Sequence, residues 1–221
     1  MRYTLEAISL IALTFASVAG ASEQFTIVIH ARTPGGTGSC TAAGLPDCIN
    51  VRPTVQIAGE MGYRFYIFVN NYNDIQGLQT AFAWPSDWMF GLDGEPEPVY
   101  PCRTNQVSHH IPHDPGGPNE GIYATTFDCF VGPGLAVIGR MDFLVYGTSG
   151  CLTQLNPNRG SGRVEILDCE NRSYRIDASD PVQRSRLGSI CAGTPGHDAC
   201  DPLSTPIEPA TWGRIKASYA P

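Results

Sequence analysis

The chain has 221 residues and a formal net charge of −7, because 21 aspartate and glutamate residues outnumber 14 lysine and arginine residues. An acidic chain has no electrostatic reason to bind nucleic acid or an anionic membrane surface, which excludes both classes of partner. The length suits one domain with an additional segment better than two full domains.

The first 21 residues have the order of a secretion signal. Arg2 is followed by an apolar run from Ile8 to Val18 and then by small residues up to Ala21. A membrane-spanning helix needs about 20 apolar residues, and this run is shorter and contains polar residues. We therefore expect cleavage after Ala21, a mature chain with no membrane span, and a secreted or cell-surface location.

Short apolar runs separated by Gly, Pro, Asn and Asp clusters fill residues 22–176, with almost no helical periodicity. Large apolar residues alternate with small or polar ones in Leu78–Trp84 and Arg140–Val145, which is typical of strands with one buried face. Tyr63–Val69 is apolar on both faces except for Arg64, which predicts a central or covered strand. The pattern predicts an all-β fold, a two-sheet β-sandwich of about nine strands. The expected strands are Phe25–Arg32, Ile49–Ile57, Tyr63–Asn70, Leu78–Trp84, Ile122–Phe130, Ala136–Tyr146, Leu152–Asn156, Val164–Asp168 and Ser173–Ile176.

Two segments interrupt this strand pattern. Residues 90–121 are rich in proline and too long for an ordinary connection, so we predict a loop that carries a binding surface. Residues 177–221 are polar and rich in proline and glycine, which predicts a tail outside the sandwich domain. Within that tail a short C-terminal helix has an apolar stripe of Trp212, Ile215 and Tyr219. The stripe packs either on the protein's own sandwich, which we favour, or on a neighbouring molecule.

Eight cysteines behind an export signal predict a disulfide framework. No two of them have the C-x-x-C spacing of a zinc site. Sequence alone does not choose the pairing, and we expect neighbours to pair because each pair then closes a short separate loop. The expected pairs are Cys40–Cys48, Cys102–Cys129, Cys151–Cys169 and Cys191–Cys200.

Two stretches carry a resemblance to a known family. Residues 66–84 run from an apolar strand through an Asn/Asp turn to Gly77 and then to alternating apolar residues, and Gly134 later leads the strand pattern up to Val145. This order resembles the cohesin-like β-sandwich, a family of secreted bacterial modules with jelly-roll topology. The resemblance covers about residues 48–176 and implies that fold and a role in holding another protein. The segment Pro85–Trp88 and the cysteines depart from the family pattern, and a dockerin-type duplicated calcium loop is absent.

Metal binding has two candidate segments. Imidazole and carboxylate groups are the usual ligands of zinc, and His109, His113 and Asp114 offer them within one proline-containing segment. Solvent-facing loop histidines are the simpler explanation. The turn at residues 70–74 offers oxygen atoms for a weak calcium site, although a solvated turn uses the same residue types. No cofactor is predicted, and weak calcium or zinc binding remains the alternative.

Exposed aromatic residues are the candidates for sugar binding. Trp88 and Tyr100 flank the long proline-rich segment, where their rings can stack on a carbohydrate. Trp84 follows the apolar alternation and is expected in the core instead.

The sequence contains no G-x-S-x-G elbow, no H-E-x-x-H motif and no glycine-rich phosphate loop. We therefore predict a secreted or cell-surface, non-enzymatic module with a structural or protein-binding role, whose partner is an extracellular protein or another copy of the chain. A carbohydrate-binding module that holds a polysaccharide is the first alternative. A metal-dependent hydrolase centred on His109 and His113 is the second.

Overall fold

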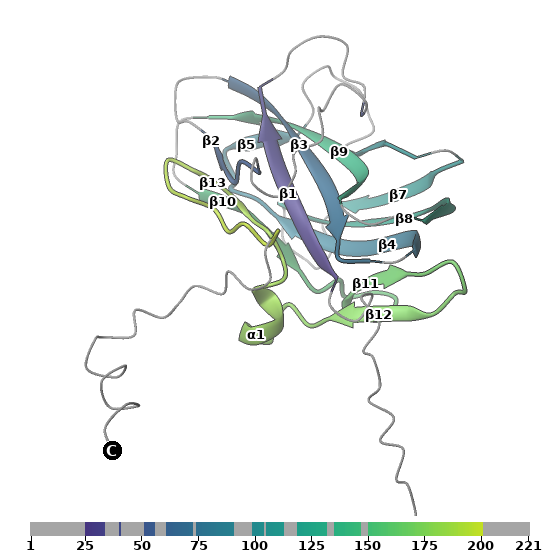
Figure 1. Cartoon of the computed structure of the whole chain (residues 1–221). Helices are drawn as coiled ribbons and strands as arrows, with labels where there is room; N and C mark the ends of the chain where they lie inside the picture. The colour runs from purple at the N-terminus through teal and green to yellow at the C-terminus, as the bar shows by residue number, and fades with distance from the viewer. Residues whose placement is uncertain are drawn as a thin grey trace, which may run out of the picture.

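The computed structural model describes residues 25–33, 40, 51–55, 61–72, 74–90, 99–103, 105–112, 119–131, 135–146 and 150–200. Two β-sheets pack face to face, with β1, β3 and β9 in one layer and β4, β7, β8, β11 and β12 in the other (Figure 1). The predicted two-sheet, all-β sandwich is therefore confirmed.

The first sheet has five strands in antiparallel pairing. Its order is β1, β3, β9, with β5 and β6 lying one after the other along the far edge of β9. The strands are β1 (Thr26–Arg32), β3 (Met61–Asn70), β5 (Trp88–Phe90), β6 (Val99–Pro101) and β9 (Ala136–Val145).

The second sheet has eight strands built around β4. On one side, β4 pairs with β8, and β8 pairs with β7. On the other side, the first half of β4 pairs with β11 and the second half of β4 pairs with β10. β12 extends the sheet beyond β11, and β13 and then β2 extend it beyond β10. The strands are β2 (Thr54–Val55), β4 (Asp74–Ala83), β7 (Val107–Pro112), β8 (Glu120–Val131), β10 (Gly150–Leu155), β11 (Val164–Leu167), β12 (Ser173–Ile176) and β13 (Ile190–Ala192).

The main core lies between the two sheets and contains the inward side chains of the alternating strands. Phe65 stacks on Phe143 with their ring centroids 5.2 Å apart, and Phe82, Tyr123 and Ile166 close the layer from the other sheet. Each fully buried side chain of this size contributes about 1.5–3 kcal/mol to the free energy of folding. The core therefore follows directly from the period-two pattern of the sequence.

A second hydrophobic cluster covers the outer face of the five-stranded sheet. Val28, Tyr66 and Phe68 point away from the main core and are buried against Val137 and Cys200. The same face buries an ionic cluster of Asp142 with Arg140 and Arg64, whose Nε atoms lie 3.0 Å and 3.7 Å from the carboxylate oxygens. β3 lies between β1 and β9 and is covered on both faces, which confirms the prediction of a central or covered strand.

Residues 90–121 do not form one long loop. Their described parts contain β6 and β7, and β7 pairs with β8 along its whole length. Pro101 and Pro112 are each the last residue of their strand, a position where proline's missing N–H group is tolerated. The proline content therefore marks strand ends here rather than the absence of strands.

The described part of the predicted tail belongs to the sandwich. Residues 177–200 include the short helix α1 (Pro181–Arg184), capped by the Asp180 side chain, and β13. The Gly188 N–H group donates to the Ile27 carbonyl at 2.7 Å, and the Ile27 N–H group donates to the Arg186 carbonyl at 3.0 Å. The expected boundary at residue 176 thus does not separate two structural units, and residues 1–21 and 201–221 lie outside the described residues.

The predicted disulfide framework is confirmed, but all four neighbour pairings are wrong. The sheets bring distant cysteines together instead, because strand pairing rather than sequence distance sets their separation. For example, Cys151 of β10 lies directly opposite Cys191 of β13. The pairs are Cys40–Cys102, Cys129–Cys169 and Cys151–Cys191. Cys200 is also disulfide-bonded, and Cys48 lies outside the described residues.

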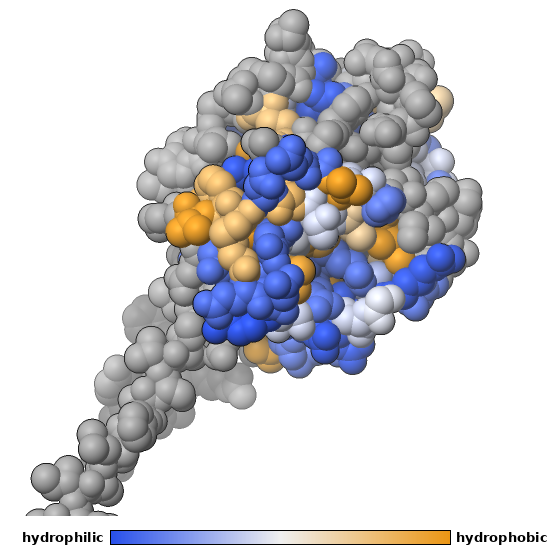
Figure 2. All heavy atoms as spheres, turned by 90° about the vertical axis from the view of Figure 1, so that its right-hand side faces the viewer, coloured by the Kyte–Doolittle hydropathy of each residue, from blue (hydrophilic) through white to orange (hydrophobic). Residues whose placement is uncertain are grey.

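Figure 2 shows the side of the molecule that lies on the right in Figure 1. Hydrophobic side chains there are interspersed with hydrophilic ones and do not form one large patch.

Candidate binding face

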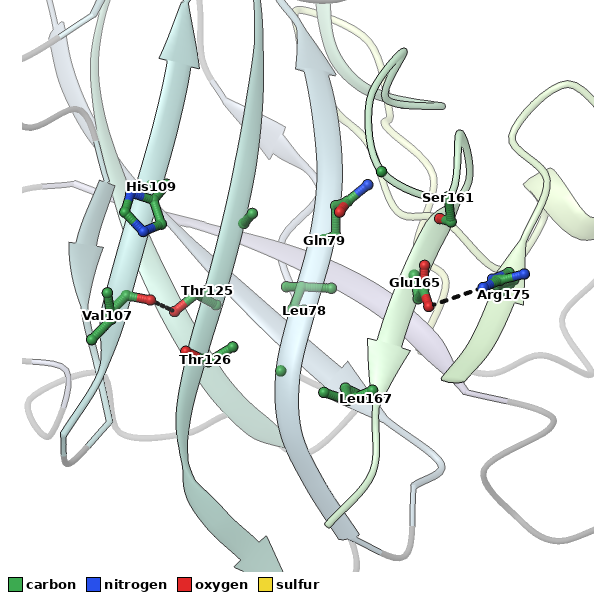
Figure 3. Close-up of a pocket in the computed structure, with 13 residues that line it drawn as sticks. Leu78, Gln79, Val107, His109, Thr125, Thr126, Ser161, Glu165, Leu167 and Arg175 are labelled. Carbon is green, nitrogen blue, oxygen red and sulfur yellow. Dashed lines mark hydrogen bonds and ion pairs between the residues drawn. The ribbon is translucent and has the colours of Figure 1, made fainter. Parts of the chain in front are cut away.

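A groove with a volume of about 530 Å³ runs across the outer face of the eight-stranded sheet (Figure 3). Strands β7, β8, β4, β11 and β12 form it, together with the loop before β11. The lining residues are Gly77, Leu78, Gln79, Val107, His109, Ala124, Thr125, Thr126, Gly160, Ser161, Glu165, Leu167 and Arg175.

Strand register arranges the floor of the groove as an apolar row. Val107 pairs with Thr126, Thr126 with Gly77, and Gly77 with Leu167, so these four residues follow one another across four neighbouring strands. Val107 is 56% exposed, and Leu167 is half-buried. The apolar row therefore offers aliphatic surface that no described residue covers.

Gly77 makes a notch in the middle of the apolar row. A Cβ atom at this position would lie 3.2 Å from Leu167 Cβ and 3.2 Å from the Thr125 carbonyl oxygen, tighter than ordinary contact. The absence of a side chain thus lets β8 and β11 approach β4 closely, and no side chain of β4 projects from the floor at this point.

A second row of residues, two positions along each strand, is polar. His109 pairs with Ala124, Ala124 with Gln79, Gln79 with Glu165, and Glu165 with Arg175. Because side chains two residues apart point to the same face of a sheet, this polar row lies beside the apolar row about 7 Å away. The groove therefore presents an apolar and a polar strip in parallel.

The charged end of the polar row is an ion pair between Glu165 and Arg175. The Arg175 Nη2 atom donates to Glu165 Oε1 at 3.4 Å, as the dashed line in Figure 3 marks. The Arg175 side chain is 55% exposed, whereas the Glu165 side chain is 18% exposed. A partner approaching this end of the groove therefore meets the guanidinium group first.

The middle of the polar row is held by the loop before β11. The Gln79 side-chain amide donates to the Arg159 carbonyl at 3.0 Å. The next residue, Gly160, has a φ of +64°, and a Cβ atom there would collide with the Gln79 amide. These contacts fix Gln79 against the loop, so its amide nitrogen is already used within the chain.

The β7 wall is anchored to β8 from the inner side of the sheet. The Gln106 amide donates to Thr125 Oγ1, to the Tyr123 hydroxyl and to the Ile138 carbonyl, each at 2.9 Å. Burial raises the pKa of Tyr123, which keeps its hydroxyl neutral and able to accept this bond. The strand that carries Val107 and His109 is therefore fixed even though it lies at the edge of the sheet.

Of the three predicted metal ligands, His109 is the one that the structure describes, and it lies in the groove. His109 is exposed on β7, a strand rather than a loop, and faces the polar row. His113 and Asp114 lie outside the described residues. Within the ranges that the structure describes, no group of three His, Cys, Asp or Glu residues is placed to hold a metal ion.

Trp88 is the candidate for sugar binding whose side chain the structure describes. The prediction that this side chain is exposed is wrong. Trp88 is 2% exposed because it begins β5, whose pairing with β9 turns the ring into the core against Phe65 and Phe143. Trp84 is half-buried and packs on Phe143 at 5.7 Å, which confirms its expected core contact. The Tyr100 side chain and the whole of Trp212, Ile215 and Tyr219 lie outside what the structure describes.

At the turn considered for calcium, the described side chains have structural roles. The Asn70 side-chain amide donates to the Cys200 carbonyl at 2.8 Å, and Asn71 takes the positive φ of a tight turn. Asn73 lies outside the described residues, so calcium binding stays a prediction.

Apart from His109, sequence reasoning did not select the residues that form the groove. Glu165 and Leu167 alternate with the buried Val164 and Ile166, so their outward direction was readable from the pattern. What the pattern does not contain is the order of the strands, which places these residues beside Gly77 and Val107. The groove therefore became visible only with the sheet topology.

No helix among the described residues is long and apolar enough to cross a membrane. No family model and no curated protein matches the sequence. Solved structures similar to this chain include three cohesins. A type III cohesin module from a cell-surface anchoring scaffoldin of Ruminococcus flavefaciens is 7% identical, with a TM-score of 0.48, and the match covers 80% of this chain and 91% of that one.

A non-cellulosomal cohesin from the archaeon Archaeoglobus fulgidus is 12% identical, with a TM-score of 0.43 and coverage of 76% and 89%. A cohesin from a type I cohesin–dockerin complex of Clostridium thermocellum is 9% identical, with a TM-score of 0.43 and coverage of 63% and 87%. These likenesses concern the fold alone, and each has a TM-score below 0.5.

Proposed function

We propose that the protein is a secreted or cell-surface, non-enzymatic module that binds another protein in the groove of its eight-stranded sheet. The observation that carries this proposal is the difference between the two outer faces of the sandwich. The second hydrophobic cluster buries Val28, Tyr66 and Phe68 on one face, whereas Val107 and Leu167 on the other face have no described cover.

The groove has the composition of a protein-binding surface. Its apolar row is rimmed by a histidine, an amide and an ion pair, and interfaces commonly combine an apolar centre with a polar rim. Among the described residues that line the groove, none has a Trp, Tyr or Phe side chain of the kind that stacks on sugar rings. Protein binding is therefore favoured over carbohydrate binding.

The test is a binding experiment with matched surface variants. Residues 22–221 are immobilised and exposed to the extracellular proteins of the source organism, as wild type and as the variants Val107→Asp and Leu167→Asp. The control variant is Val182→Asp, whose side chain is 78% exposed on α1, away from the groove. We expect the groove variants to lose the captured protein and the control to keep it.

Thermal melting of each variant verifies that the fold is retained. Capture that is unchanged in both groove variants would contradict the proposal. Retention on polysaccharide beads with no captured protein would favour the carbohydrate-binding alternative.

A further inference from the structure

We infer that the partner inserts one aliphatic side chain into the notch at Gly77 and places an acidic side chain on Arg175. This inference rests on the proposed function and adds the chemistry of the partner. It follows from the two parallel rows of the groove. The apolar row complements an aliphatic side chain, and the polar row complements a charged one.

The apolar half of the inference rests on the notch. Val107 and Thr126 stand on one side of Gly77 and Leu167 on the other, and all three belong to one row. An aliphatic side chain resting over Gly77 would contact the side chains of its two direct neighbours, Thr126 and Leu167, and Val107 borders the site one strand further out, about 10 Å from Gly77. Anchors of binding energy are usually single side chains that fill a pocket and exclude water in this way.

The acidic half of the inference rests on unequal exposure in the polar row. Arg175 is the more exposed member of its ion pair, and its planar fork has more donors than the single 3.4 Å contact to Glu165 uses. At the other end of the row, the exposed His109 ring can also donate a hydrogen bond. A carboxylate on the partner complements these donors, whereas a cation would face the guanidinium group.

The negative charge of the whole chain does not oppose this local pairing. The formal charge of −7 is spread over the entire sequence. At physiological ionic strength, charges separated by more than about 8 Å are largely screened, so the nearest groups decide. Gly77 and Arg175 lie two strands and two residues apart, which places their backbones roughly 12 Å from each other. Two residues that are two to four positions apart in an extended partner strand are separated by roughly 7–13 Å, and the length of the Arg175 side chain spans the difference.

A library of random twelve-residue peptides displayed on phage tests the inference without knowledge of the natural partner. We expect selection on immobilised residues 22–221 to enrich Leu, Ile, Val or Met with Asp or Glu two to four positions away. The selected peptide, made synthetically, should lose roughly tenfold or more in affinity when Thr126→Trp fills the notch from an exposed position. Val131→Trp, on the same strand and 72% exposed in the wild type, should have no effect.

Charge reversal tests the acidic contact separately. The double variant Glu165→Gln/Arg175→Glu should bind the acidic peptide roughly tenfold more weakly and should regain affinity for a peptide whose acid is replaced by lysine. Arg184→Glu makes the same arginine-to-glutamate replacement on α1 and should leave the binding of both peptides unchanged.

Each outcome decides between the two proposals. Enriched peptides that respond to Thr126→Trp but need no acidic residue would overturn the inference and leave the proposed function standing. No peptide sensitive to Thr126→Trp would overturn both. Enrichment of a Trp-x-x-Ile-x-x-x-Tyr pattern would identify the chain's own residues 212–219 as the occupant and would also overturn the inference.

Discussion

Cys129 and Cys169 form a disulfide between the end of β8 and the turn after β11, although 40 residues separate them in the sequence. β8 and β11 both pair with β4 at Gly77, so the disulfide joins the two strands that flank the notch of the groove. It therefore fixes the distance between the strands that carry Thr126 and Leu167, and it also stabilises the sheet.

Removing this disulfide should lower stability and loosen the groove. In the chain-entropy model a closed loop of 40 residues contributes about 4 kcal/mol to the free energy of unfolding, so Cys129→Ser/Cys169→Ser should lose up to about that amount. Cys151→Ser/Cys191→Ser is the matched control because its separation is also 40 residues. Urea titration should show losses of similar size, and peptide binding should weaken only in the first variant. Equal peptide binding by both would show that the disulfide does not shape the groove.

The side chain of Gln154 connects the two sheets, and its loss should destabilise the whole domain. Its amide nitrogen donates to the Gly188 carbonyl at 3.0 Å and to the Ile27 carbonyl at 3.2 Å, and Thr80 Oγ1 donates to its oxygen at 3.2 Å. Gln154→Met removes these three buried hydrogen bonds, which should cost about 2–4 kcal/mol of unfolding free energy. The Ile27 carbonyl keeps its bond from the Gly188 N–H group, and Thr80 Oγ1 keeps its bond to the Ala81 carbonyl.

The control for this prediction is Gln76→Met. Gln76 donates to Asn171 at an exposed position, so its replacement should change the unfolding free energy by no more than about 0.5 kcal/mol. Urea denaturation of both variants measures the difference. A loss at Gln154 as small as that at Gln76 would mean that water replaces the lost partners.

Local patterns and global arrangement differ in how far the sequence predicts them. The alternation in residues 78–84 and 140–145 correctly predicted strands and the face that enters the main core, because side-chain direction in a strand depends only on position. The expectation of a single buried face is wrong for residues 140–145, because Arg140 and Asp142 on the other face are buried as well. The disulfide pairs and the burial of Trp88 depend on which strands become neighbours, and residues far apart in the chain decide that. The groove also depends on which strands become neighbours, because its rows run across β7, β8, β4, β11 and β12.

Gly196 should resist any substitution because two backbone segments meet on it. A Cβ atom there would collide with the carbonyl oxygens of Pro53 and Ser189, and its N–H group donates to Pro53 at 3.2 Å. Gly196→Ala must push these segments apart, which should cost about 2–3 kcal/mol of unfolding free energy. Gly162→Ala has open space and only a φ of +64° to accommodate, so about 1 kcal/mol is expected.

Thermal melting of the two glycine variants measures this difference. It also tests whether residues 177–200 belong to the domain, because Gly196 lies beyond the boundary that the sequence indicates. A melting temperature for Gly196→Ala equal to that of the wild type would mean that this segment separates from the sandwich without loss.

His30 should make the domain less stable in mild acid. The side chain is 5% exposed, and its Nδ1 atom accepts a hydrogen bond from the Arg52 N–H group at 3.0 Å. Burial, together with the positive charges of Arg32 and Arg52, lowers the pKa of His30 to about 4.

The sign of the pH effect follows from the lowered pKa of His30. The folded state keeps the ring neutral, whereas the unfolded state takes up a proton below its ordinary pKa of 6.5. The stabilisation is therefore complete above pH 6.5 and is lost as the pH falls from 6.5 toward 4. We expect the unfolding free energy to fall by about 1–2 kcal/mol more in the wild type than in His30→Gln between about pH 7 and pH 4.5.

Glutamine at position 30 retains an acceptor for the Arg52 N–H group and does not titrate. His109→Gln changes an exposed histidine and serves as the control, which should follow the wild type. Urea titrations at the two pH values measure these differences, and parallel curves for the wild type and His30→Gln would show that another group causes the acid sensitivity.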